Sequence, residues 1–182
     1  MVAATVVGMF AFLGAGCSPD EEGSARPEGT ASPAPSAPSS PQGGDAGEAL
    51  AGLEPCQLIG ADQLAEFGDM APGQPENVGT ARDCRFDLAN RESTERTLLI
   101  SVGIRDQQGI SDAQDRGNGI DHGEVDGRQF ARIPSTGSCT VAIGVTESSR
   151  VDVYAGTTDG TEEACRIADE VAAMVEPELP QG

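Results

Sequence analysis

The five cysteines are the residues of this sequence with the most distinctive chemistry. Cys17 follows the small residues Gly14-Ala15-Gly16 and an uncharged apolar run, residues 2–13. A run of this length suits the central region of a signal peptide and is too short to span a bilayer. We therefore expect cleavage before Cys17, a diacylglycerol on its thiol and a further acyl chain, such as palmitate, on its amino group. The alternative is a plainly secreted protein in which the cysteine lies near the cut by chance.

The other four cysteines, Cys56, Cys84, Cys139 and Cys165, form an even set. Export places them in an oxidising compartment, where four cysteines usually form two disulfides. They include no C-x-x-C, and their spacing matches no zinc pattern. Sequence alone allows three connectivities. We predict Cys56–Cys84 and Cys139–Cys165, because each bridge would then join a helical region to a nearby strand within a local unit.

Side chains suited to catalysis are few. His122 is the only histidine, and a Ser or Cys nucleophile needs a base of suitable pKa. The sequence has no G-x-S-x-G, and Cys139, which follows Ser138, is assigned to a disulfide. Acids are numerous, but a glycosidase needs two of them held at a fixed separation in a cleft, and the chain is only 3% aromatic. We predict no catalytic residues.

Metal and phosphate sites also lack a matching pattern. Five acids could gather around calcium, but their spacing does not fit the D-x-D-x-D-G loop; they are Asp112, Asp115, Asp121, Glu124 and Asp126. Gly117-Asn118-Gly119 predicts a turn rather than a phosphate cradle, because no strand and helix flank it. We therefore predict neither a metal nor a cofactor.

Charge restricts the partners. The chain has 11 Lys and Arg against 30 Asp and Glu, and a net charge of -19. Nucleic-acid binding needs a basic footprint, so this composition argues against it. The same charge argues against adhesion to an anionic bilayer, which leaves a lipid anchor as the expected contact with the membrane. Solubility through self-repulsion is the simplest reason for the acidity.

Composition divides the chain into three parts. Residues 1–16 are the expected lipoprotein signal peptide. Residues 17–53 are rich in Pro, Ser, Gly and Ala, and they cannot bury enough apolar surface to offset the cost of ordering, which predicts a disordered tether. Residues 54–182 form one domain of ordinary size. The core must be mainly Ala, Val, Leu and Ile, because the chain lacks Trp.

Apolar periodicity within residues 54–182 predicts the elements that hold the cysteines. Alternation predicts strands at Cys84–Leu88 and Thr97–Arg105, and a hairpin in which Cys139–Val145 turns back into a short last strand at Val151–Val153. Apolar residues every three or four positions predict a helix over Thr161–Val175, ended by Pro177.

Weaker signals cover the rest. Near-helical spacing predicts a short helix at Ala61–Phe67, and Gln129–Ile133 predicts a strand stopped by Pro134. Residues 70–80 are expected to be loop, and residues 106–126 show no sustained period. Since strands and helices do not alternate, the fold class is α+β: an antiparallel sheet with a short N-terminal helix, a long C-terminal helix packed on it and two disulfides.

Several short motifs together resemble a known family. They are Pro55-Cys56-Gln57-Leu58-Ile59, Cys84-Arg85-Phe86, Val125-Asp126-Gly127, Cys139 in a strand and Cys165 in a terminal helix. In this order they are similar to the actinobacterial lipoproteins grouped as domain of unknown function 3558. The resemblance implies a lipid-anchored protein of the cell envelope and implies no known activity.

These observations favour a protein on the extracytoplasmic face of the cell membrane. Its expected role is a non-enzymatic accessory module that binds an envelope protein or a small ligand. The alternative is an extracytoplasmic hydrolase acting on wall polymer or peptide. Residues 106–126 are the candidate binding surface, because unstructured segments of this length are uncommon in compact domains unless functional or disordered. Six acids there would favour a cationic or metal-bridged partner; the alternative is a solvated loop.

Overall fold

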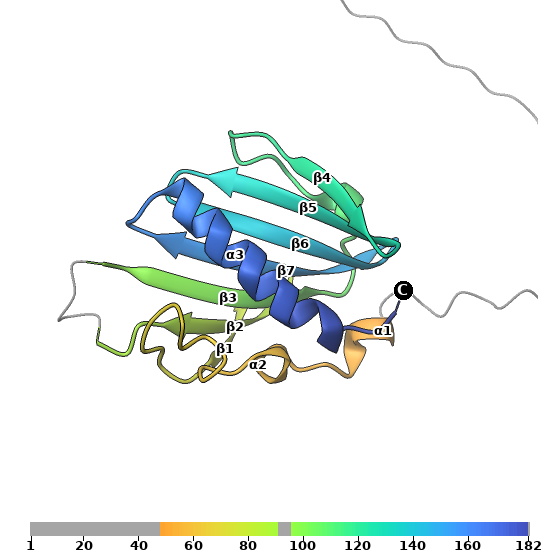
Figure 1. Ribbon diagram of the computed structural model, residues 1–182. Helices are drawn as coiled ribbons and strands as arrows, with labels where there is room; N and C mark the ends of the chain where they lie inside the picture. The colour runs from red at the N-terminus through yellow and green to blue at the C-terminus, as the bar shows by residue number, and fades with distance from the viewer. Residues whose placement is uncertain (1–47, 91–95, 182) are drawn as a thin grey trace, which may run out of the picture. The chain divides into compact units, whose positions relative to one another are not determined.

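The computed structural model describes residues 48–90 and 96–181. These residues form a seven-stranded antiparallel sheet with the order β1-β2-β3-β7-β6-β5-β4. The long helix α3 crosses one face of the sheet (Figure 1). The strands are β1 Gln74–Val78, β2 Ala81–Asp87, β3 Leu98–Arg105, β4 Asp121–Val125, β5 Arg128–Ser135, β6 Ser138–Thr146 and β7 Ser149–Thr157. The helices are α1 Glu48–Ala51, α2 Pro55–Leu58, η2 Ile110–Asp112, α3 Thr161–Val175 and η3 Glu176–Glu178.

Where the apolar pattern is strongest, the structure has the predicted element. The strand expected at 97–105 is β3, the expected hairpin is β6–β7, and the helix expected at Thr161–Val175 is α3. The prediction of an antiparallel sheet with a long C-terminal helix and two disulfides is therefore confirmed.

Helix α3 forms because one stripe of small and branched residues meets the sheet. Ile167, Ala168 and Val171 are fully buried, which is the three- and four-residue spacing of a single helix face. The acids Glu162 and Glu163 lie in the first turn, where the helix dipole favours negative charge. Alanines in the stripe bring the helix close to strands β6 and β7, on which it packs.

Both disulfides join a helix to a strand. Cys56 of α2 is bonded to Cys84 of β2, and Cys139 of β6 to Cys165 of α3. This is the predicted pairing, and Cys84, Cys139 and Cys165 are buried in the main core. In the chain-entropy model, closing loops of 28 and 26 residues contributes roughly 3–4 kcal/mol each. The bridges thus reinforce a core that has few large aromatic side chains.

The prediction of a helix at Ala61–Phe67 is wrong. These residues form successive turns whose backbone bonds span three residues, as in the bond from the amide of Phe67 to the carbonyl of Leu64. Leu64 and Phe67 are both buried. Their separation of three suits a run of tight turns as well as a helix, so the apolar spacing could not distinguish the two. The short helix that does form is α2, over Pro55–Leu58.

Two strands lie where no strand was predicted. Residues 74–78 form β1, and residues 121–125 form β4, at opposite edges of the sheet. All residues of both strands are exposed, so neither has the alternation of apolar and polar residues that marks a half-buried strand. The loop expected over residues 70–80 is therefore wrong at 74–78. Pro75 is tolerated in β1 because an edge strand leaves some amides unpaired.

Strand β5 also runs further than expected, because Pro134 does not stop it. Pro134 lies opposite Cys139 of β6, while β4 pairs with β5 only as far as Arg132. At Pro134 the strand has a partner on one side alone, so the missing amide hydrogen costs no ladder bond.

The folded unit begins before the expected boundary at residues 53 and 54. Leu50 of α1 is fully buried in the main core. The guanidinium of Arg82 donates hydrogen bonds to the carbonyl oxygens of Leu53, at 2.6 Å, and Leu50, at 3.0 Å. One apolar residue and two backbone acceptors thus attach residues 50–53 to β2, a connection that composition could not indicate. The predicted signal peptide and Cys17 lie outside the described residues.

Candidate ligand-binding groove

One helix cannot cover seven strands, and this leaves a groove. A helix is about 10 Å across, whereas neighbouring strands are about 4.8 Å apart, so α3 covers roughly two strands. It packs on β6 and β7 and only touches β5, while residues around α2 pack against β1, β2 and β3. Strand β4 lies beyond the helix at the edge of the sheet (Figure 1). The surface of β4 and β5 on the helix side is therefore open.

We call this opening the α3–β4 groove. It has a volume of about 500 Å³. Its floor is formed by β5 and β6, one wall by α3, and the other wall by β4 and the turn that follows it. The lining residues are Asp121, His122, Gly123, Val125, Asp126, Phe130, Arg132, Val141, Asp169, Ala172, Ala173 and Glu176.

The strand register explains why the groove is apolar inside. Phe130 of β5 lies opposite Gly123 of β4, and Arg132 lies opposite Val141 of β6. Gly123 has open space where a side chain would stand, so nothing from β4 covers the side of Phe130. On α3 the facing residues are Ala172 and Ala173, whose side chains are too short to fill the gap.

Val125 extends the apolar surface to the rim. It is 62% exposed, and Val78 of β1, at 49%, is the other large hydrophobic residue exposed in the described part of the chain. Val125 is on β4 and lines the groove. An isolated exposed valine needs no explanation; one that continues an apolar floor enlarges the surface that a ligand can contact.

Charged residues surround the groove, and some of them neutralise one another. Arg132 Nε lies 3.2 Å from Oδ2 of Asp169, and Arg128 Nε donates a 2.7 Å hydrogen bond to Glu176. The Nε of Arg132 is buried, but the contact with Asp169 is too poorly aligned to count as a hydrogen bond. Within the described residues, Asp121 and Asp126 have no ion pair.

The opposite face of the sheet holds a wider and more polar hollow of about 810 Å³. Its charges are largely satisfied within the chain: Arg105 and Arg150 both pair with Asp152, and Arg85 pairs with Asp87. Burial raises the pKa of the Asp83 carboxyl, while a hydrogen bond from Ser101 lowers it in part. Glu76 and Arg116 also line this hollow and form no ion pair within the described residues, but most of its charge is paired inside the chain and its walls are more polar than those of the α3–β4 groove.

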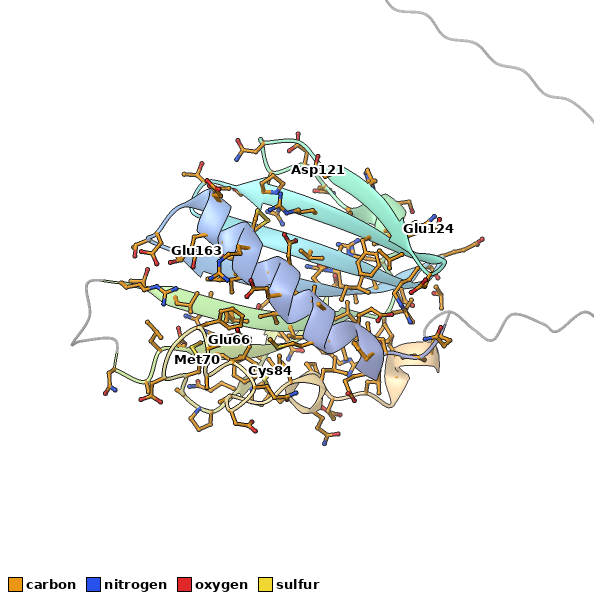
Figure 2. The ribbon with its side chains drawn as sticks, viewed as in Figure 1. Glu66, Met70, Cys84, Asp121, Glu124 and Glu163 are labelled. Atoms are coloured by element: carbon orange, nitrogen blue, oxygen red, sulfur yellow. A yellow bond between two sulfur atoms is a disulfide. The ribbon has the colours of Figure 1, made fainter. Side chains whose placement is uncertain are left out.

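The candidate segment 106–126 is divided between the two faces. Its first half crosses the polar face, where Ile110 packs on Ala131 and Ala142 in a small second core. Gly109 and Ile110 are therefore held against the sheet, whereas residues 114–119 are exposed and form neither helix nor strand, as the loop alternative expected. Its second half supplies β4 and one wall of the groove. Figure 2 labels Asp121 and Glu124 toward opposite ends of that strand.

The five acids considered for calcium do not converge. Among the described residues, no group of three His, Cys, Asp or Glu side chains could hold a metal ion. Two of the five already accept local backbone bonds: Asp112 from the amide of Gly109, and Asp115 from those of Gly117 and Gly119. His122 lies on the exposed strand β4, and its imidazole forms no hydrogen bond within the described part of the chain.

The groove itself was missed at the sequence level. Phe130, Arg132, Asp169 and Ala173 come from two elements about forty residues apart, and nothing in their local sequence marks them as neighbours. In the sequence, the only local sign was an apolar residue, Val125, between the acids Glu124 and Asp126. It could not be interpreted without knowing that β4 is a strand.

Fold and groove together define a two-layer α+β module with two disulfides, in which the helix leaves one edge of the sheet uncovered. The chain belongs to a family described as protein of unknown function (DUF3558), whose model matches residues 12–178. A search of curated proteins and a search of solved structures return no match. In the described residues, no helix is both long and apolar enough to cross a membrane.

Proposed function

We propose that this protein is a lipid-anchored module on the extracytoplasmic face of the cell membrane, which binds a small ligand in the α3–β4 groove without catalysing a reaction. The observation that carries the proposal is an open apolar floor with a charged rim. Small-molecule sites are commonly clefts of about 300–1,000 Å³ with mostly apolar walls and a few polar groups, and this groove has about 500 Å³.

The location in the envelope is supported by the cysteines. Cys17 follows an apolar run and small residues, as a lipidated cysteine does. The two disulfides suit the oxidising conditions outside the cytoplasm. The resemblance to actinobacterial lipoproteins points to the same location. The membrane contact in this proposal is the lipid on Cys17.

Binding rather than hydrolysis is supported by the placement of the groups that hydrolysis would need. His122 lines the groove from an exposed edge strand, but its imidazole forms no hydrogen bond with a Ser, Thr or Cys of the described residues, and Cys139 is bonded to Cys165. A nucleophile and its base must lie within hydrogen-bonding reach of each other. In the residues that the structure describes, no observation favours the hydrolase.

The test fills the groove with a side chain. Ala173 is exposed on α3 and lines the groove, so Ala173→Phe should occupy it without disturbing the core. Ala65→Phe is the matched control, because Ala65 is also exposed but lies outside the groove. After incubation with envelope extract, native mass spectrometry of the wild type and of Ala65→Phe should show the same small-molecule adducts, and Ala173→Phe should lose them.

Two results would contradict the proposal. One is a wild-type protein that carries no adduct. The other is an Ala173→Phe protein that keeps every adduct while its circular dichroism and melting temperature match those of the control.

A further inference from the structure

We infer that the ligand of the α3–β4 groove is a cationic amphiphile, with an apolar chain on the floor and its positive group at the β4 rim. The inference rests on the proposed function and adds the chemical class of the ligand. The inference depends on where the positive and negative side chains lie around the groove. The proposed function does not depend on that distribution.

The charges that line the groove are mostly negative. Four carboxylates, those of Asp121, Asp126, Asp169 and Glu176, stand against the single guanidinium of Arg132. The pairs described above neutralise Asp169 and Glu176. Asp121 lies opposite Arg132 in the strand register but forms no ion pair with it within the described residues. The carboxylates left without an ion pair are therefore those of Asp121 and Asp126, both on the β4 side and both exposed.

The apolar surface lies next to this uncompensated charge. Val125 is one residue before Asp126 and continues the floor formed by Phe130 and Val141. A ligand lying along the floor toward Val125 thus has its end near the carboxylate of Asp126, while Asp121 lies five residues away at the other end of the extended strand. Opposite charges that approach this closely at a protein surface attract each other.

An anionic amphiphile fits less well. The only cation in the lining, Arg132, already has Asp169 3.2 Å away, so an anionic ligand would have to compete with that carboxylate. It would also approach a chain with a net charge of -19, whose field repels anions and attracts cations. An uncharged amphiphile would gain the apolar contact alone.

The test compares three probes that share a ten-carbon chain: decyltrimethylammonium, decanoate and decyl maltoside, each below its critical micelle concentration. The full chain carrying Cys17→Ala is used, because it has no acyl chain of its own to enter the groove. Binding is followed by isothermal titration calorimetry and by amide NMR shifts. We expect shifts on β4, β5 and α3, and an affinity for the cation at least tenfold higher than for the other two probes, which corresponds to about 1.4 kcal/mol.

The charge of the rim is tested separately. Asp121→Asn combined with Asp126→Asn should lower the affinity for the cation about tenfold and leave that for decyl maltoside unchanged. Glu124→Gln is the matched control: Glu124 is on the same strand but three residues from Asp121, so its side chain belongs to the other face of the sheet. Its effect should be below about twofold. Raising the salt concentration should also weaken binding of the cation, because the rim is exposed.

The outcomes separate the inference from the proposed function. If decanoate or decyl maltoside binds the groove as tightly as the cation, the inference is wrong and the groove is still a ligand site. If the double variant binds the cation as the wild type does, the inference is also wrong. If none of the three probes shifts residues of the groove, the inference is wrong, and the adduct experiment with Ala173→Phe still decides the proposed function.

Discussion

Asp83 is a carboxylate placed where charge is unfavourable. It lies on β2, on the polar face of the sheet, and it is buried. Removal from water disfavours the ionised form, which is why its pKa is raised; the hydrogen bond from Ser101 and the charge of Arg105 compensate only in part. The folded chain therefore binds this proton more tightly than the unfolded chain does.

This shift predicts a pH dependence of stability. Because the folded-state pKa lies above the unfolded value of about 3.9, Asp83 lowers the free energy of unfolding as pH rises through the interval between the two. Asp83→Asn removes the titration and keeps an acceptor for Ser101. Its stability relative to the wild type should therefore increase from pH 3 to pH 7, as measured by urea denaturation at several pH values.

The exposed Asp62 provides the comparison. Asp62→Asn measures the effect of replacing an exposed carboxylate by an amide at each pH. A difference between Asp83→Asn and the wild type that stays flat from pH 3 to pH 7 would mean that burial does not perturb the carboxyl group of Asp83.

At the scale of the elements, the position of the segment 106–120 depends on a close contact between the backbones of Gly109 and Glu147. A Cβ added at Gly109 would lie 2.0 Å from the carbonyl oxygen of Glu147, in the turn between β6 and β7. Arg150 strengthens the contact by donating a 2.6 Å hydrogen bond to the carbonyl of Gly109. Glycine is needed here for its size, since its φ of -80° is open to any residue.

We expect Gly109→Ala to displace this segment from the sheet. Overpacking against backbone typically costs about 1–3 kcal/mol, so the free energy of unfolding should fall by that amount, and amide exchange over 106–120 should become faster. Gly123→Ala is the control in the neighbouring strand, where the added Cβ meets open space. Equal stabilities for the two variants would show that the segment is not held by this contact.

The elements also show what the sequence could predict. Strands β3, β6 and β7 and helix α3 were predicted because each buries one face, and burial requires a periodic pattern of apolar residues. The edge strands β1 and β4 bury nothing, so no such pattern marks them. The disulfides could be predicted because each joins a helix to a strand within a local unit, with a single strand between them in the chain.

The groove could not be predicted in the same way. It exists because α3 is too narrow for the sheet and because β4 is present, and both facts depend on the packing of distant segments. Ala173 is one alanine among many in the sequence, and only the position of α3 makes it a wall. Sequence reasoning thus identified the residues that stabilise the fold and, within residues 106–126, the β4 wall of the groove, but it missed the parts of the groove that β5, β6 and α3 contribute.

At the scale of the whole molecule, the prediction concerns the anchor. Full-length protein made in its native host should partition into a detergent phase, and Cys17→Ala should move it to the aqueous phase with the mass of an unmodified chain. If partitioning and mass are the same for both proteins, Cys17 carries no lipid. The groove would then belong to a secreted protein.

The contact of residues 50–56 with β2 has a mechanical consequence for a tethered protein. A pull on the chain before α1 reaches the sheet through two attachments, the hydrogen bonds of Arg82 to Leu50 and Leu53 and then the covalent bridge Cys56–Cys84. Residues 57–83 lie outside this load path, so tension cannot extend them while the bridge is intact. The force enters β2, which has a strand on each side, and the groove at the other edge of the sheet is shielded from it.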